Sequence, residues 1–166
     1  MKKSSTLIFG EALNCTSKFA LRQTLKVGGL KATREDDGYW YDLCDSSTVL
    51  EGSSKLSVAY IEEKFAKAYY TFPSSMDADK VVEVRNMVAS KYGQPTSSSG
   101  NPSVGEVSYT WNLKGGIKVE VSCGWPDTTV TLSYVHPVNF AAIEAEQERQ
   151  KQAEKAEKYS KQNKAF

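Results

Sequence analysis

The stretch 107–135, VSYTWNLKGGIKVEVSCGWPDTTVTLSYV, decides the fold of this chain. It contains three segments, 107–113, 117–123 and 129–135, in which apolar and polar residues alternate. Alternation with a period of two is typical of antiparallel strands that have one dry face and one solvated face. The sequence therefore predicts a three-stranded antiparallel meander.

The first hairpin of this meander has a predictable register. Both of its strands must turn their apolar side chains to the same face, because a shift by one residue would turn one set into water. Pairing Leu113 with Ile117 meets this condition and leaves Lys114, Gly115 and Gly116 as the loop. A glycine in such a three-residue loop supplies the left-handed backbone conformation that the loop needs.

Length and composition place the chain among ordinary globular domains. It has 166 residues, of which 40% are hydrophobic and 25% are charged, and this is typical of one soluble domain. No apolar run approaches the roughly 20 residues that a membrane-spanning helix needs. The net charge of +1 argues against a nucleic-acid partner.

The three cysteines, Cys15, Cys44 and Cys123, lie far apart in the sequence. An odd count without close spacing matches neither a disulfide framework nor a zinc site. Because free thiols favour protein interiors, we expect three buried thiols. One disulfide with one free thiol is the alternative.

Two helices are predicted from caps, apolar spacing and stop signals. The first covers Lys18–Val27, after a Thr or Ser cap and before a glycine pair. The second begins at Ser75 or Asp77, each of which can cap a helix, and ends before Gly93. The Ser-, Gly- and Pro-rich segment 96–105 is predicted to be a mobile loop.

A first group of strands lies between these helices. Strands are predicted over 39–44, 56–60 and 65–72, the last of which has Ala66, Ala68, Tyr70 and Phe72 on one side. Each helix is thus followed by about three strands, so the two halves of the chain share one plan. Two α-β-β-β units joined edge to edge predict an α+β fold. It is a two-layer sandwich, in which an antiparallel sheet of about six strands carries both helices on one face.

Residues 140–166 are predicted to form a charged helical tail after a single α+β domain over 1–139. Ala, Glu, Lys and Gln dominate the tail and favour a helix. After Ile143 the tail has almost no apolar stripe, and a helix that is polar all round packs on little. We therefore expect a solvated C-terminal helix. A coiled-coil arm for oligomerisation is the alternative, and the missing apolar heptads argue against it.

Three pieces of the sequence carry a resemblance to known proteins. They are Phe9-Gly10, Lys91-Tyr92-Gly93-Gln94-Pro95 and the closing strand Thr131-Leu132-Ser133-Tyr134-Val135-His136-Pro137. Together with the tandem plan, they are similar to a group of uncharacterised small bacterial proteins. The plan also resembles β-lactamase-inhibitor-like proteins and the small outer-membrane-assembly lipoproteins of bacteria. The resemblance covers 7–139 and implies a fold but no chemistry. It favours a bacterial envelope or secreted location, with a cytoplasmic location as the alternative.

No pattern in the sequence predicts catalysis, a cofactor or a metal site. His136 is the only histidine and lies at a strand end before a proline, where an inert histidine is expected. An acidic cluster near the first strand could approach a cation, but a polar turn and strand edge is the preferred interpretation. The cluster comprises Asp36, Asp37, Asp42 and Asp45. We expect no enzymatic activity. The alternative is a thiol-based enzyme or redox protein that would use Cys44 or Cys123.

The predicted function is that of a non-catalytic module that binds a protein partner. The solvated face of the meander offers short, nearly neutral side chains that give a partner little to hold by charge. They are Ser108, Thr110, Asn112, Thr129, Thr131 and Ser133, with Lys118 and Glu120 between them. Binding energy would therefore come from aromatic anchors at the rim of this face. Trp125 in the 124–128 turn is the first candidate and Trp40 the second. The alternative is a structural subunit that assembles through its C-terminal helix.

Overall fold

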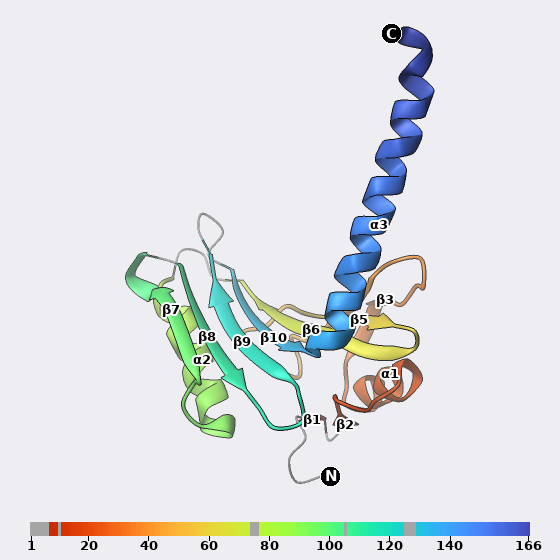
Figure 1. Cartoon of the computed structure of the whole chain (residues 1–166). Helices are drawn as coiled ribbons and strands as arrows, with labels where there is room; N and C mark the ends of the chain where they lie inside the picture. Colours follow the sequence, from red (N-terminus) through yellow and green to blue (C-terminus); the bar gives the residue numbers. More distant parts are fainter. Residues whose placement is uncertain (1–6, 10, 74–76, 105, 125–128) are drawn as a thin grey trace.

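An antiparallel sheet forms the body of the protein (Figure 1). A computed structural model describes residues 7–9, 11–73, 77–104, 106–124 and 129–166. Within these residues the sheet has eight strands in the order β3-β4-β5-β6-β10-β9-β8-β7, and three α-helices accompany it. The predicted α+β class with an antiparallel sheet is confirmed, whereas the predicted count of about six strands is wrong. A separate pair of short strands, β1 (Leu7–Ile8) and β2 (Glu11–Ala12), lies near the N-terminus.

The predicted meander is present as β8 (Glu106–Asn112), β9 (Lys118–Cys123) and β10 (Val130–Val135). The Leu113 amide donates to the Ile117 carbonyl at 3.3 Å, so the predicted register is confirmed. Gly115 and Gly116 have φ angles of 93° and 84°, in the left-handed region that the three-residue loop requires.

Within the eight-stranded sheet, the two strands that the sequence did not predict are its two edges. They are β3 (Lys31–Arg34) and β7 (Ser97–Asn101), and nearly all of their residues are exposed. A strand that buries neither face leaves no alternation in the sequence. The prediction of a loop over 96–105 is therefore wrong for β7 and for the short 3-10 helix η2 (Pro102–Val104) that follows. Gly100 fits here because its φ is 79° and a Cβ would lie 2.2 Å from the Glu106 carbonyl oxygen.

The first group of strands contains a β-bulge. β5 (Lys55–Ile61) pairs with β6 (Lys64–Phe72), and the register shifts between Ala59, which pairs with Lys67, and Tyr60, which pairs with Phe65. The extra residue on β6 is Ala66, which turns away from the main core and packs against Ile143 instead. The prediction that Ala66 shares a face with Ala68 is therefore wrong. β4 (Tyr41–Asp45) completes this group and begins two residues later than predicted.

Two helices cover one face of the sheet, which we call the inner face. α1 (Lys18–Val27) has the predicted bounds, and the Ser17 hydroxyl accepts a hydrogen bond from the Ala20 amide at its start. α2 (Asp79–Tyr92) begins later than predicted and has no side-chain cap. Both helices bury apolar side chains in one core with the inner face of the strands. From the helices these are Leu21, Leu25, Val81, Val84 and Val88.

The third helix, α3 (Pro137–Gln162), follows β10 directly and ends in the short turn η3 (Asn163–Ala165). Its first turns pack on the opposite, outer face of the sheet, where Ile143 is fully buried against Ala59 and Ala66. The rest of α3 rises away from the sheet, and the C-terminus lies far from the body (Figure 1).

Candidate functional site

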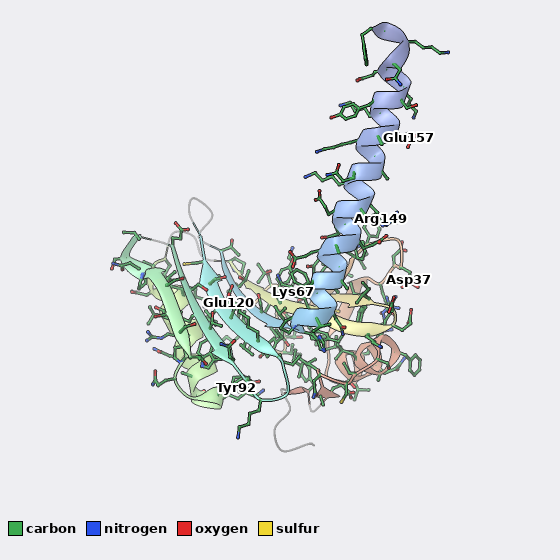
Figure 2. The ribbon with its side chains drawn as sticks, viewed as in Figure 1. Asp37, Lys67, Tyr92, Glu120, Arg149 and Glu157 are labelled. Atoms are coloured by element: carbon green, nitrogen blue, oxygen red, sulfur yellow. The ribbon has the colours of Figure 1, made fainter. Side chains whose placement is uncertain are left out.

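The base of α3 forms an aromatic cluster on the outer face of the sheet. Half-buried Trp40, Tyr41, Ile61 and Phe140 pack around the buried Ile143. The ammonium of Lys67 on β6 lies 4.7 Å from the centre of the Phe140 ring and 5.5 Å from that of Tyr69. Figure 2 shows Lys67 at the foot of the helix. A mixed aromatic and cationic surface therefore surrounds the point where α3 leaves the sheet.

Tyr41 connects this cluster to the sheet and to the helix. Its ring meets that of Tyr69 edge to face, with centroids 5.6 Å apart. Burial, then the neighbouring Tyr69 and the carboxylate of Glu144 on α3, raise the pKa of Tyr41. The phenol therefore stays neutral at physiological pH, which suits a ring held between a strand and a helix.

The single histidine has a structural task at the start of α3. His136 Nδ1 accepts a hydrogen bond from the Asn139 amide at 3.2 Å and so caps the helix. Its own amide donates to the Ala66 carbonyl at 2.8 Å, and Asn139 Nδ2 donates to the Phe65 carbonyl at 2.7 Å. Three hydrogen bonds thus fix the direction in which α3 departs, two of them to the bulged part of β6.

The two predicted anchors have different outcomes. Trp125 lies outside the described residues. Trp40 lies just before β4 and is half-buried against the base of α3. The base of α3 covers part of the Trp40 surface. The role of Trp40 as a partner anchor stays a prediction. Sequence reasoning missed Lys67 and Tyr69, since it did not foresee that β6 passes under the helix.

Most residues of the predicted solvated face of the meander are partly exposed, but Ser133 is only 8% exposed, so its predicted exposure to solvent is wrong. Its strand, β10, lies in the middle of the sheet and leads directly into α3. Ser108, Ser122 and Thr131 stand in one row across β8, β9 and β10, with a hydrogen bond of 3.1 Å between the Ser122 and Thr131 hydroxyls. Thr110 and Glu120 belong to the next row. Near β7 this face has a depression of about 350 Å³. Most side chains in these rows are short and polar, as expected for a surface with little charge.

The only histidine and one cysteine line a common depression of about 420 Å³. Cys15 and His136 meet there with Asn14, Lys64 and Asn139. No hydrogen bond joins Cys15 to His136 among the described residues, because the thiol donates weakly to the Ala12 carbonyl and Nδ1 of the imidazole serves as the helix cap. The groups are neighbours without the contact that a nucleophile and its base require.

All three cysteines are free thiols, and their exposures differ. Cys15 is exposed, so the expectation of three buried thiols is wrong for this residue. Its segment follows β2 and forms a turn, which leaves the thiol outside the core. Cys44 is buried, and burial, followed by the charges of Asp42 and Glu35, raises the pKa of its thiol to about 11. Cys123 is half-buried, and mainly burial raises the pKa of its thiol.

These differences predict the order in which the thiols react. At pH 8 a thiol with a pKa near 11 is thiolate in only about one molecule in a thousand, so Cys44 should resist alkylation in the folded protein. Cys15 should react first. Iodoacetamide labelling followed by peptide mass spectrometry measures the order, and Cys15→Ser should abolish the fast phase. Fast labelling of Cys44 at pH 8 would contradict the expectation and favour the thiol-enzyme alternative.

The acidic cluster has partners from α1. Asp42 receives two hydrogen bonds from Arg22, at 2.7 Å from Nε and 2.9 Å from Nη2. Asp37 pairs with Arg22 at 3.2 Å and also with Lys18. Asp45 accepts hydrogen bonds from Ser47. Within the described residues no group of three or more acidic, cysteine or histidine side chains is arranged to hold a metal ion.

An apolar cleft of about 250 Å³ lies on the inner face beside α2. Phe9, Leu50, Tyr70 and Tyr134 line it together with Tyr92, whose hydroxyl is buried without a hydrogen-bond partner among the described residues. Burial and the neighbouring Tyr92 and Tyr70 raise the pKa of Tyr134 well above its ordinary value. The cleft is therefore mostly apolar, and Lys91 is the charged residue among those that line it.

Beyond its base, α3 has no contact with the sheet that buries it. Every residue from 147 to 166 is exposed. Figure 2 shows Arg149 and Glu157 on the part of the helix that projects beyond the sheet. Among the described residues, no helix combines the length and the apolar character that crossing a membrane would demand.

Comparisons with known proteins give one structural likeness. No protein-family model matches the chain, and no curated protein matches it. The fold is similar to the crystal structure of YjgB, a DUF4309 family protein from Bacillus subtilis, with a TM-score of 0.44 and 14% sequence identity. The match covers 79% of this chain and 88% of that chain. The resemblance to β-lactamase-inhibitor-like proteins and outer-membrane-assembly lipoproteins stays a prediction.

Proposed function

We propose that the protein is a non-catalytic protein-binding module and that α3 is its binding element. The observation that carries the proposal is the exposure of residues 147–166 in a helix that is continuous with the packed base. At about 1.5 Å per residue, the exposed part of α3 extends more than 20 Å from the last half-buried residue, Glu146.

An exposed helix of this kind gains little from its own domain. Most helical stability in proteins comes from packing an apolar face, and short isolated helices are marginal in water. Residues 147–162 bury no face, and the helix is held by the cap and the buried Ile143 at its base. A partner that packs along this segment would add the tertiary contacts that it lacks.

The aromatic cluster at the base supports the same proposal. Phe140, Trp40 and Lys67 surround the origin of α3 and are half-buried. A partner that follows the helix to its base would meet aromatic side chains, which contribute strongly at interfaces. Trp40 is then an auxiliary anchor. Binding through a rim that includes Trp125, without the helix, is the second proposal, carried by the flat polar face of the meander.

The test is affinity capture of partner proteins from the organism that encodes this protein. The intact chain and variants of α3 serve as baits and are compared. We expect a chain that ends at Glu146 to lose its partner. Ala153→Pro should have the same effect, because a proline inside a helix costs about 3 kcal/mol and would melt the projecting half. Ala153→Gln is the matched control, which keeps the helix and should retain the partner.

Two further variants separate the proposals. Trp40→Ala should weaken capture only partly if the helix is the main element. If the chain that ends at Glu146 folds normally and keeps every partner while Trp125→Ala loses them, the binding element is the rim and not α3.

A further inference from the structure

The charges along α3 are segregated by sign. Three acidic residues, Glu144, Glu146 and Glu148, come first. From 149 to 164 there are six cations and two anions, so this part of the helix is basic. The projecting helix thus has an acidic half next to the body and a basic half towards the C-terminus.

Some of these charged residues form no ion pair in the described part of the chain. Arg149 pairs with Glu146 at 2.5 Å and Lys161 with Glu157 at 2.9 Å. In the described part of the chain, Glu144, Glu148, Lys155 and Lys158 take part in no ion pair. Glu148 accepts only a neutral hydrogen bond, from Gln152 at 2.8 Å. Glu144 and Glu148 lie in the acidic half and Lys155 and Lys158 in the basic half, which also contains one unpaired acid, Glu154.

These four residues also lie along one side of the helix. Glu148 and Lys155 are seven residues apart, which is close to two turns, and Glu144 and Lys158 flank them at spacings of four and three. Next to this side runs a line of Ala145, Arg149, Gln152, Ala156 and Tyr159, at spacings of four, three, four and three. A second helix can approach closely at the two alanines of this line, because their side chains are small.

We propose that α3 binds the α3 of a second copy of this chain, antiparallel, about a two-fold axis near residues 150 and 151. This inference rests on the proposed function and names the partner. In this register Glu148 faces Lys155 of the other copy and Glu144 faces its Lys158. Lys151 lies on the same side near the axis and faces Lys151 of the other copy, so it is the one like-charge contact among these positions. The two-fold axis repeats each contact, because an isologous interface makes every contact twice.

Charge decides the orientation. A parallel pair would set acidic half beside acidic half and basic half beside basic half, and like charges at an interface oppose binding. The antiparallel pair matches opposite charges and places Ala145 opposite Ala156. It also sets the two sheets at opposite ends of the paired helices, since each C-terminus lies far from its own sheet (Figure 1).

The pair should be weak and sensitive to salt. Its central line has small and polar side chains, and exposed ion pairs contribute little each. Raising the salt concentration from about 0.05 M to 0.5 M shortens the Debye length to a few ångströms and should weaken the dimer at least about tenfold. Sedimentation equilibrium of the intact protein measures this change.

Exchanging the charges of the facing residues on α3 tests whether the partner is a second copy of this chain. Glu144→Lys with Glu148→Lys makes the side uniformly basic, and Lys155→Glu with Lys158→Glu makes it acidic except for Lys151. Each double variant alone should be monomeric, with a dissociation constant raised at least about tenfold. An equimolar mixture of the two should form a heterodimer, because the four facing pairs made by residues 144, 148, 155 and 158 then have opposite charges. Failure of the mixture to associate overturns the proposal.

Cross-linking tests the orientation without changing charge. In a Cys15→Ser background, Ala145→Cys on one copy and Ala156→Cys on the other should form an intermolecular disulfide in good yield. Ala145→Cys alone should not cross-link to itself. Efficient self-cross-linking of Ala145→Cys indicates a parallel pair and overturns the proposal.

The outcomes separate this inference from the proposed function. If the intact protein is monomeric at high concentration and low salt, self-pairing is wrong. Capture of a different partner that depends on residues 147–166 then still supports α3 as a binding element. If the chain that ends at Glu146 dimerises as strongly as the intact chain, α3 is not the dimer contact.

Discussion

Replacing Trp111 by alanine is expected to lower the free energy of unfolding by about 4 kcal/mol, which is typical of the loss of a buried tryptophan. Trp111 lies one residue before the end of β8 and is only 1% exposed. It packs in the core between the sheet and α2. Deletion of its side chain would leave a cavity under that helix.

The indole of Trp111 also forms a hydrogen bond. Its Nε1 donates a hydrogen bond of 2.8 Å to the carbonyl of Gly93, the residue that ends α2 with a φ of 84°. Trp111→Phe keeps most of the apolar burial but loses this donor, so it should cost about 1–2 kcal/mol. Urea unfolding of the two variants separates the contributions of packing and hydrogen bonding.

Trp40→Ala is the matched control, because Trp40 is half-buried and belongs to the smaller cluster at the base of α3. Its loss should cost clearly less than that of Trp111. Equal losses for Trp111→Phe and Trp111→Ala would show that the hydrogen bond to Gly93, and not the ring volume, carries the stability.

The sequence was most informative where one face of a strand is buried. Alternation located β8, β9 and β10 and predicted the register of the first hairpin, because a shift between β8 and β9 would expose Trp111 or Val119. The same argument failed for β3 and β7, which are exposed on both faces and therefore have no pattern. The count of strands was wrong for this reason alone. That the two halves are copies of one duplicated unit stays a prediction.

The candidate site was less predictable than the fold. The sequence predicted a solvated tail helix and gave no contact between its base, at Phe140 and Ile143, and the sheet. Its contact depends on the bulge at Ala66, which turns a small residue to the outer face under the helix. A bulge depends on tertiary packing and leaves no short motif. The position of Lys67 and Tyr69 beneath α3 was therefore outside the reach of sequence patterns.

The second large effect is expected at the ion pair between α1 and β4. Asp42→Ala should lower the free energy of unfolding by about 3–4 kcal/mol, in the range measured when one partner of a buried pair is removed. The Asp42 side chain is 8% exposed and the Arg22 side chain 19% exposed. Both hydrogen bonds between them run in parallel from the guanidinium to the carboxylate, which is the strongest geometry for such a pair.

The Asp42→Ala variant loses stability because the Arg22 guanidinium cannot become neutral by losing a proton. The hydrogen bond to Asp42 raises the pKa of Arg22 above an already high ordinary value, so the guanidinium is charged at every pH at which the protein is folded. Without Asp42 it would keep only Asp37, which is exposed, and the more distant Glu35 at 3.9 Å. The cation would remain over the Tyr60 ring, 5.8 Å from its centre, in a place where water reaches it poorly.

A double variant decides whether the charge or the lost contact is responsible. Arg22→Met with Asp42→Leu removes both charges and keeps similar volume, so it should be within about 1 kcal/mol of the natural protein. Glu51→Ala, at an exposed carboxylate, is the matched control and should change little. Thermal and urea unfolding give the three values. If the double variant is as unstable as Asp42→Ala, the pair contributes net stability through its own hydrogen bonds, and the penalty of an unpaired cation is not the cause.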